Sequence, residues 1–464
     1  MHIGKAITGN LLAGSLGRII NALTPLVLVP LTIRSWGLHE YGEWLILAAI
    51  PTYIMLSPDL GLAVAVVNQM AKATAEGRRT EAICLYRTSW VFLTGMAICF
   101  VALGIALASW LNWTPLGVTL LSKDAAGIIS WLLAQIFLGQ QLYLTLGIYR
   151  SARRNARGIL IDTLGYALYL LVGCAALLLG ADPLRYIAAL VAARGVVLTA
   201  MLLDARRIMP DFTLSLRGVS ARAVRPYIVP GLGFAAMPLV NAMQNEGMLL
   251  VLGALLGPVS VAVFQTSRTA VNGVKSLSGL VASAVGVEIP ALVGEGRMST
   301  VRRVLTMNTQ ATIAVAFAWS LLLGVFGRQI FHLWLRTNAV YSSSLILLML
   351  SGMFPFALGS SFSLILQATN QIHRAVLLLL AAGLVSLAAT AAGARWLGVN
   401  GAGLGMLVFE TLGLLVVGYV ASKYAGIQAR ATLASIFSRQ SLAAASGSAM
   451  SLLRNAGSRL SGAA

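Results

Sequence analysis

Charged residues are scarce in this sequence, and acidic residues are the scarcest charged type. Only 10% of its 464 residues are charged, with 14 acidic and 33 basic residues, whereas 58% are hydrophobic. A water-soluble domain usually carries about 25% charged residues. The composition therefore excludes a soluble enzyme, a disordered chain and a nucleic-acid-binding module. It is typical of a polytopic inner-membrane protein whose helices lie in lipid and whose basic loops face the cytoplasm.

Residue types that bind metals or perform catalysis are also few. Three cysteines lie far apart, without the spacing of a disulfide framework or a metal site, and four histidines are scattered. The phosphate-binding motif GxxxxGK[ST] is absent, as is any nucleophile–base pattern or any sizeable loop for a catalytic domain. We therefore expect neither an enzyme nor a bound cofactor or metal, and no nucleic-acid partner. The first apolar stretch, 11–33, lacks a cleavage site and is expected to remain as a span.

Long apolar runs fill most of the chain. Each run is about as long as the roughly 20 residues that cross a bilayer core, and none shows the period-2 alternation of strands. The sequence therefore predicts an all-α membrane protein with about twelve transmembrane helices. The predicted spans are 11–33, 44–69, 88–110, 126–149, 158–180, 183–204, 227–252, 259–287, 304–327, 341–368, 375–394 and 400–422.

A long basic connection divides these spans into two sets of six. The predicted organisation is an N-terminal six-helix half at 1–204, a cytoplasmic linker at 205–226, a C-terminal six-helix half at 227–422 and a basic cytoplasmic tail at 423–464.

The halves share a short sequence match that suggests internal duplication. Gly37 follows the first span and Gly257 follows the seventh, and each is followed by a small residue five positions later and an aromatic residue two positions beyond that. Their equivalent places predict two pseudo-symmetric bundles around a central cavity.

Basic residues alternate from loop to loop. The loops on one side of the predicted membrane hold 23 Lys and Arg, whereas those on the other side hold six. The positive-inside rule places both termini in the cytoplasm. Most of the net charge of +19 is therefore explained by topology alone, although basic loops could also bind anionic lipid headgroups or sugar phosphates.

Few ionisable residues fall at bilayer depth, where each costs several kcal/mol unless it faces a partner or water. They are Arg18, Asp59, Asp162, Arg194, Glu246, Arg268, Lys275 and Glu410. Because cations and acids are equal in number, two interpretations stay open. The charges either pair with one another or bind a substrate and a coupling ion.

Spacing brings some of these residues onto shared helix faces. Gln265, Arg268, Asn272 and Lys275 recur at i, i+3, i+7 and i+10, which predicts one polar face of the eighth span. Such a face is unsuited to lipid and is expected to line a cavity.

The fourth and fifth spans carry a second polar group. Asp162, Tyr166 and Tyr169 share a face of the fifth span, and Gln135 and Gln141 lie in the fourth. The tyrosines could stack on a sugar or simply pack, and the glutamines could bond sugar hydroxyls or other helices.

Three segments resemble a known family. They are Pro30–Gly37 leading into Glu40–Trp44, Asp59–Leu62, and Leu252–Pro258. Together they resemble Wzx-type polysaccharide flippases, which belong to the multidrug/oligosaccharidyl-lipid/polysaccharide exporter superfamily. Pro58 departs from the apolar residue usual in that pattern.

The resemblance implies a function. Such proteins move undecaprenyl-pyrophosphate-linked oligosaccharide repeat units across the inner membrane by alternating access, which we expect to be coupled to an ion gradient. The units enter O-antigen (lipopolysaccharide), capsule or exopolysaccharide biosynthesis. Expected partners are the lipid-linked oligosaccharide, membrane lipids, a polysaccharide polymerase and a chain-length regulator.

Site residues follow from this interpretation as hypotheses. Buried cations would offset the pyrophosphate charge, neighbouring amides would contact the sugar, and buried acids would carry the coupling ion. The expected substrate-binding residues are Arg18, Arg194, Arg268, Lys275, Asn272 and Gln265, and the expected ion-coupling residues are Glu246 and Asp59.

Three rival functions were weighed against this one. A multidrug exporter of the same superfamily commonly has a coupling acid in the first span, where this chain has Arg18. A lipid II flippase typically has more spans than the twelve predicted here. A membrane glycosyltransferase would need a large outside loop with catalytic groups, and none is evident.

Overall fold

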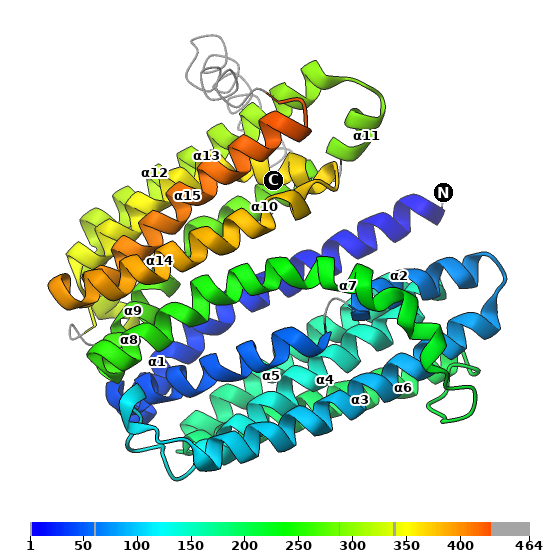
Figure 1. Ribbon diagram of the computed structural model, residues 1–464, viewed down its shortest axis with the longest axis horizontal. Coiled ribbons are helices and arrows are strands. Elements are labelled where there is room, and N and C mark those ends of the chain that lie inside the picture. The colour runs from blue at the N-terminus through cyan, green and yellow to red at the C-terminus, as the bar shows by residue number, and fades with distance from the viewer. Residues whose placement is uncertain (1, 60–61, 287, 337–339, 428–464) are drawn as a thin grey trace, which may run out of the picture. The chain divides into compact units, whose positions relative to one another are not determined.

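The computed structural model describes residues 2–59, 62–286, 288–336 and 340–427, which are almost entirely helical and contain no strand (Figure 1). The chain divides into two compact units, Met1–Thr266 and Ser267–Ala464. The division at a 205–226 linker remains a sequence-based prediction.

The first unit contains α1 to α8 and most of α9. Its helices are α1 (His2–Asp59), α2 (Leu62–Ala75), α3 (Arg79–Trp110), α4 (Ala125–Ser151), α5 (Asn155–Leu178), α6 (Pro183–Ile208), α7 (Ala221–Ala242), α8 (Met248–Leu256) and α9 (Pro258–Val271), with short turns η1 (Thr114–Leu116) and η2 (Met243–Gly247).

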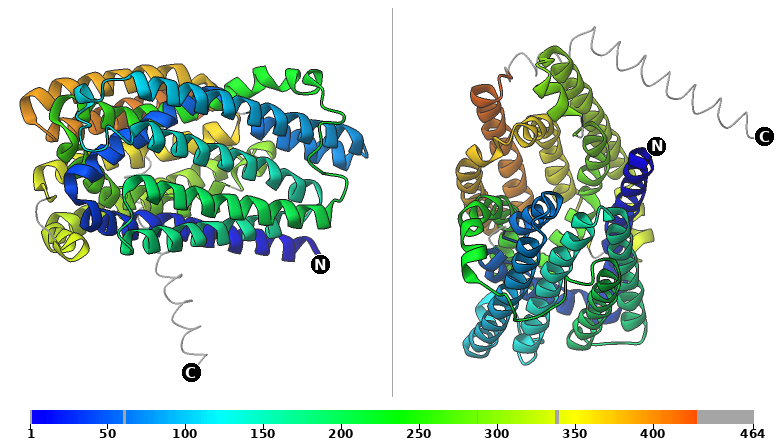
Figure 2. Two further views of the ribbon diagram at one scale, coloured as in Figure 1. Left: turned by 90° about the horizontal axis from the view of Figure 1, so that it is seen from below. Right: turned by 90° about the vertical axis from the view of Figure 1, so that its right-hand side faces the viewer.

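The second unit begins at the end of α9. Its helices are α10 (Gly273–Gly286), α11 (Ile289–Gly294), α12 (Met298–Leu335), α13 (Ser343–Ala368), α14 (Val376–Leu397) and α15 (Asn400–Tyr424), with a short turn η3 (Ile372–Arg374). Within this unit α13 packs against both α12 and α15, and α14 packs against α15 (Figure 2).

The predicted all-α membrane architecture is confirmed. Ten helices among the described residues are long and apolar enough to cross a membrane. Ten is fewer than the twelve predicted spans for two reasons. First, α1 holds the first span and most of the second, joined across Gly37. Second, the predicted span 259–287 is divided into α9 and α10, each of 14 residues.

Helix ends extend beyond the apolar runs. The structure begins α3 at Arg79 and α12 at Met298, whereas the sequence predicted these spans from residues 88 and 304. Hydropathy marks the part of a helix that suits lipid, but intrahelical hydrogen bonds also form in the polar turns outside it.

Gly37 and Gly257 adopt the same unusual backbone conformation. Gly37 has φ 80° and ψ 172°, and Gly257 has φ 81° and ψ 177°. A positive φ favours glycine because it has no Cβ. Each glycine therefore turns the chain between the first two spans of a half, which agrees with the duplication inferred from the sequence.

The two glycine turns also meet in space. A Cβ built on Gly42 would lie 2.0 Å from the carbonyl oxygen of Pro258, so no larger residue fits there without a backbone shift. Glycine at position 42 thus allows the start of the second span to touch the start of the eighth.

A large apolar core holds the first unit together. It joins α2, α3, α4 and α6, with α4 between α3 and α6 (Figure 1, Figure 2). Met70, Tyr86 and Tyr149 are fully buried in it. The hydroxyl of Tyr149 donates to the carbonyl oxygen of Met201 at 3.0 Å, so its polar group is satisfied inside the core.

The connection between α6 and α7 is bonded to α3. The guanidinium of Arg87 donates to the carbonyl oxygens of Asp211, Thr213 and Arg217 over 2.9–3.3 Å, and to the Thr213 hydroxyl at 3.0 Å. Arg79 adds an ion pair to Asp211 at 2.9 Å. These bonds hold the linker against the N-terminal part of α3.

Candidate functional site

A small cavity lined by both polar and apolar side chains lies between α4, α5 and α6 of the first unit. It has a volume of about 90 Å³, and Gly139, Asp162, Tyr166 and Arg194 are among the residues that line it. The guanidinium carbon of Arg194 lies 5.8 Å from the centre of the Tyr166 ring, within cation–π range. Glycine at 139 makes room for this arrangement, since a Cβ there would lie 3.1 Å from Nη2 of Arg194.

The charge of Arg194 is only partly met by its surroundings. No ion pair of 4 Å or less joins it to any acid among the described residues, and its buried Nε has no hydrogen-bond partner there. Asp162 lines the same cavity and interacts electrostatically with Arg194. Burying such a donor unpaired is costly, so this cavity is suited to an anionic or hydrogen-bond-accepting ligand.

The remaining polar residues of α4 and α5 bond other helices. The side-chain amide of Gln135 donates to the Tyr169 hydroxyl at 3.0 Å, and that of Gln141 donates to the Trp90 carbonyl oxygen and the Thr94 hydroxyl. Of the two roles left open by the sequence, helix-to-helix bonding is the one the structure displays.

Glu246 lies in a π-helical turn, η2, between α7 and α8. Such single turns occur inside α-helices and are frequent at functional sites. The hydroxyl of Tyr53, in the second arm of α1, donates to the carbonyl oxygen of Ala242 at 3.0 Å, immediately before the turn. Glu246 has an interaction partner of its own and lies within electrostatic reach of Tyr53. An acid is therefore placed where a membrane helix departs from regular geometry.

The predicted polar face of the eighth span falls on an interrupted helix. Asn272 separates α9 from α10, and the indole nitrogen of Trp319 donates to the carbonyl oxygen of Ala270 at 2.9 Å just before it. A Cβ on Gly273 would lie 2.3 Å from the Trp319 ring, so glycine is required for this packing. The tryptophan occupies the position beside the break.

Lys275 and Glu410 form an ion pair inside the second unit. Nζ of Lys275 lies 2.6 Å from Oε1 of Glu410, and the Glu410 side chain is only 8% exposed. The ammonium also lies 5.2 Å from the centre of the Phe356 ring. Mutual pairing, one of the two roles left open by the sequence, therefore holds for Lys275.

The second unit also contains a neutral polar network, which lies between α12 and α13. The amide of Asn308 donates to the Ser361 hydroxyl at 2.9 Å, and the Thr309 hydroxyl bonds the same oxygen at 2.7 Å. Ser361 in turn donates to the carbonyl oxygen of Leu305. The network joins two helices at depth, in the way expected of buried hydroxyl and amide groups.

The other residues expected at the site are distributed differently. Arg18 is exposed on α1, and Arg268 is buried. Gln265 and Arg268 each have an interaction partner, and Asn272 is half-buried at the helix break. The side chain of Asp59 lies outside the described residues.

Sequence reasoning placed Glu43 in an outside loop, whereas the structure buries it completely. Its carboxylate accepts the backbone N–H groups of Thr119, Leu120 and Leu121 over 2.7–3.0 Å, and the Thr119 hydroxyl at 2.9 Å. His39 lies 3.1 Å away. A sequence signal for this burial was present: in the family-like segment Glu40–Trp44, Glu43 lies between Gly42 and Trp44, directly before an apolar run. Glu43 binds the α3–α4 connection to α1.

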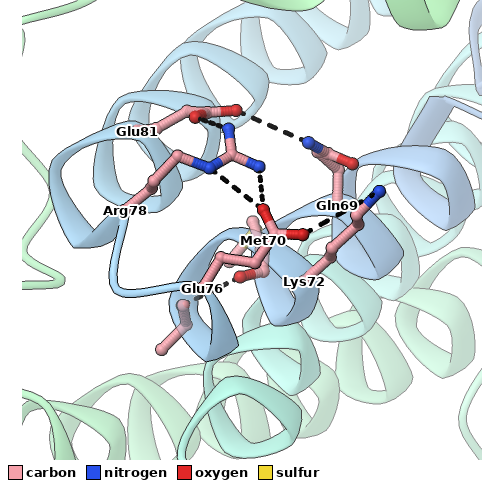
Figure 3. Close-up of polar contacts among 7 residues, drawn as sticks. Gln69, Met70, Lys72, Glu76, Arg78 and Glu81 are labelled. Carbon is pink, nitrogen blue, oxygen red and sulfur yellow. Dashed lines mark hydrogen bonds and ion pairs between the residues drawn. The ribbon is translucent and has the colours of Figure 1, made fainter.

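The basic loop between α2 and α3 contains its own counter-charges. Arg78 lies between Glu76 and Glu81 and pairs with both, and Lys72 approaches Glu76 at 4.0 Å (Figure 3). The Arg78 hydrogen bond holds the pKa of Glu76 below its ordinary value. Local pairing leaves little positive charge here for a phosphate ligand, so topology is the better explanation of this loop. In the described part of the chain, no cluster of His, Cys, Asp and Glu could hold a metal ion.

Comparisons with known proteins show similarity at the level of structure. No known sequence family matches the chain, and no curated protein is detectably similar to it. A multidrug resistance MATE family transporter of the MOP superfamily, solved in an inward-facing conformation, superposes with a TM-score of 0.73 at 16% identity, over 87% of this chain and 95% of that one.

Two further solved structures differ in their described roles. The lipid II flippase MurJ, in an inward closed conformation, matches with a TM-score of 0.66 at 11% identity, over 92% of this chain and 91% of that chain. A MOP superfamily transporter from Pyrococcus furiosus is described as having a binding pocket of reversed polarity. It matches with a TM-score of 0.61 at 15% identity, over 91% of this chain and 96% of that chain. The chain is therefore a multi-pass membrane protein with the fold of the MOP superfamily transporters.

Proposed function

We propose that this protein is a flippase for lipid-linked oligosaccharides. Its substrate would be an undecaprenyl-pyrophosphate-linked repeat unit, translocated across the inner membrane by alternating access for O-antigen, capsule or exopolysaccharide assembly. The resemblance of three sequence segments to Wzx-type flippases motivates the substrate, and the fold supports a transporter.

The observation that carries the proposal is the state of Arg194. Its guanidinium lines a small cavity in the first unit, and its buried Nε has no hydrogen-bond partner among the described residues. Guanidinium groups bind phosphate oxygens through paired, charge-assisted hydrogen bonds. A pyrophosphate would accept hydrogen bonds from this guanidinium, a contact that a cationic drug lacking acceptor oxygens would not make.

Lys275 has a different role in this proposal from the one expected. Because its ammonium pairs with Glu410 at 2.6 Å, it is not a free site for phosphate in this conformation. Arg194 is accordingly the first candidate for the anionic head, and Arg18 and Arg268 remain further candidates. Asn272 and Gln265 remain candidates for sugar contacts.

Glu246 is the proposed ion-coupling residue with the stronger structural support. It lies in the π-helical turn η2, within reach of Tyr53. A carboxylate there can take up and release a proton or sodium ion while the turn changes its hydrogen bonding. Asp59 stays a second candidate on sequence grounds alone.

A multidrug exporter is the alternative, and one observation favours it. The MATE transporter gives a higher TM-score than the lipid II flippase, 0.73 against 0.66. One observation argues against a multidrug exporter: the first span carries Arg18, whereas multidrug exporters of this superfamily commonly carry an acid there.

Deleting the gene separates these functions. A flippase deletion should lose surface glycan and accumulate lipid-linked repeat units on the cytoplasmic face, with unchanged drug sensitivity. Normal surface glycan in a strain with no second flippase, together with increased drug sensitivity, would support the exporter. A polysaccharide polymerase and a chain-length regulator remain the partners to test by co-purification from the intact strain.

A further inference from the structure

A long groove lies along α5 and α6 of the first unit, with α1 at its margin. Its volume is about 1080 Å³, an order of magnitude larger than that of the cavity beside Arg194. Apolar side chains from both helices form its walls, and three charged side chains stand at one end. The walls include Leu160, Leu164, Leu168, Val196 and Leu203.

Small residues make the groove deep. Gly165 on α5 and Ala200 on α6 line its floor. A Cβ on Gly165 would lie 2.8 Å from a methyl group of Val197, so glycine lets the two helices approach each other closely at this point. The result is a depression whose walls and floor are hydrocarbon.

The length of the groove matches one leaflet. Its lining on α5 runs from Ala156 to Leu168, and twelve residue steps of helix span about 18 Å. Half of a bilayer core is about 15 Å thick. A single acyl chain extending inward from a headgroup at the charged end would therefore lie along the groove.

The three charged residues that line this end, Arg157, Asp204 and Arg207, have a net charge of +1. Arg157 donates from Nε and Nη2 to the two carboxylate oxygens of Asp204, at 2.9 and 2.5 Å. The Tyr149 hydroxyl shares its one proton between the Met201 carbonyl oxygen and Asp204, each 3.0 Å away. Asp204 is thereby fully engaged. Arg207 is exposed beside this pair and supplies the remaining positive charge.

The charged end also belongs to the basic side of the predicted topology. It lies where α5 begins, at Asn155, and where α6 ends, at Ile208, next to the basic loops that the positive-inside rule places in the cytoplasm. The inner leaflet on that side carries anionic lipids.

We propose that this groove binds one phosphatidylglycerol-type phospholipid, with an acyl chain between α5 and α6 and the phosphate on Arg207. The single negative charge of that lipid equals the single excess positive charge of the site. A zwitterionic lipid would bring an additional cationic group toward Arg157 and Arg207. The site is separate from the cavity beside Arg194, so it stands whether or not the protein is a flippase.

Photocrosslinking in vesicles tests the proposal. The full-length protein is reconstituted in phosphatidylethanolamine vesicles that contain a small fraction of phosphatidylglycerol with a photoactivatable acyl chain. After irradiation, crosslinked peptides are mapped by mass spectrometry. We expect crosslinks concentrated at 160–168 and 196–203, and weaker labelling there by a phosphatidylcholine probe with the same acyl chain.

Two variants and their controls sharpen the result. Ala200→Trp fills the floor of the groove, and Arg207→Glu reverses the charge at its end. Each should reduce labelling by phosphatidylglycerol about tenfold, the size expected for one charge-assisted contact or one filled pocket. Thr199→Trp and Arg302→Glu, exposed positions outside the groove, should label like the unaltered protein.

Three outcomes would overturn the proposal. Equal labelling by both headgroups would mean that the groove holds bulk lipid only. Unchanged labelling in Ala200→Trp and Arg207→Glu, with a normal gel-filtration profile, would place the lipid elsewhere. Displacement of the probe by a polyprenyl phosphate, but not by unlabelled phosphatidylglycerol, would assign the groove to a prenyl chain.

Discussion

Nζ of Lys275 on α10 donates to Oε1 of Glu410 on α15 across 2.6 Å, inside an apolar helical unit. One of the four cations expected at bilayer depth is therefore matched by an acid from the other end of the same unit. Arg194 differs from it, because no acid lies within ion-pair distance among the residues described. The contrast separates a charge held in a short ion pair from a charge that meets an acid, Asp162, only at longer range.

Breaking the Lys275–Glu410 pair on one side should destabilise the protein. Lys275→Met removes the ammonium beside a carboxylate that is 8% exposed, and breaking a buried ion pair on one side typically costs about 3–5 kcal/mol. Because Lys275 keeps partial exposure, we expect the lower end of that range. Thermal unfolding in detergent measures the effect. The double variant Lys275→Met/Glu410→Gln should recover most of the loss, and equal destabilisation of the single and double variants would contradict this account of the pair.

Replacing Glu43 should loosen the connection between α3 and α4. Glu43→Gln keeps the shape but removes one acceptor oxygen and turns an N–H group toward backbone donors. Leaving buried donors unsatisfied costs about 1–3 kcal/mol for each group, so a clear fall in melting temperature is expected. Glu40→Gln, a half-buried neighbour on the same helix, is the matched control. Equal melting temperatures for the two variants would argue against the role assigned to Glu43.

Arg87 should protect the linker between α6 and α7 from proteolysis. Arg87→Ala removes four hydrogen bonds to the segment 211–217, and we expect limited proteolysis there to accelerate about tenfold as local opening becomes easier. Arg78→Ala, which loses only contacts within its own loop, should leave the cleavage rate unchanged. Slow cleavage in both variants would show that other contacts hold the linker.

The Tyr166 ring should support the action of Arg194. Tyr166→Leu removes the cation–π contact, worth about 0.5–2 kcal/mol, and should reduce glycan export about three- to tenfold. Tyr166→Phe retains an aromatic face and should stay close to the unaltered protein. Complementation of a deletion strain, normalised to protein level, provides the measurement. A Leu variant with full export would remove Tyr166 from the site.

Membrane orientation is the fifth prediction. In a chain whose three cysteines are replaced, a cysteine at Ser215 should be shielded from a membrane-impermeant thiol reagent in intact cells, because the linker is expected in the cytoplasm. A cysteine at Ser122 should be labelled. The reverse pattern would invert the topology.

Hydropathy and charge were sufficient for much of the fold. Every predicted span lies mostly in helix among the described residues, and the two matched glycines, Gly37 and Gly257, share one backbone conformation. The break at Asn272 was missed because the apolar run 259–287 predicts one continuous span, although the dipeptide Asn272-Gly273 is a local turn signal. Trp319, which packs beside the break, lies more than 40 residues further along the chain. No local pattern contains that packing.

The candidate site was less accessible to sequence reasoning. Periodicity identified the face of α5 that carries Asp162 and Tyr166, and both residues line the cavity with Arg194. It could not identify the partner of Lys275, because that pairing depends on how α10 and α15 meet. Glu43 was assigned to a loop because its carboxylate is bonded mainly by backbone N–H groups of residues 119–121, which are distant in the sequence.

The central claim is that Arg194 serves the transport of an anionic lipid-linked glycan. The most direct test is translocation in proteoliposomes, with the purified protein and a fluorescent undecaprenyl-pyrophosphate-linked sugar whose exposure is read by a membrane-impermeant quencher. We predict transport by the unaltered protein, partial activity in Arg194→Lys, none in Arg194→Glu, and normal activity in Arg185→Ala, an exposed position on the same helix. Full activity of Arg194→Glu, or transport of organic cations in place of the lipid-linked sugar, would contradict it.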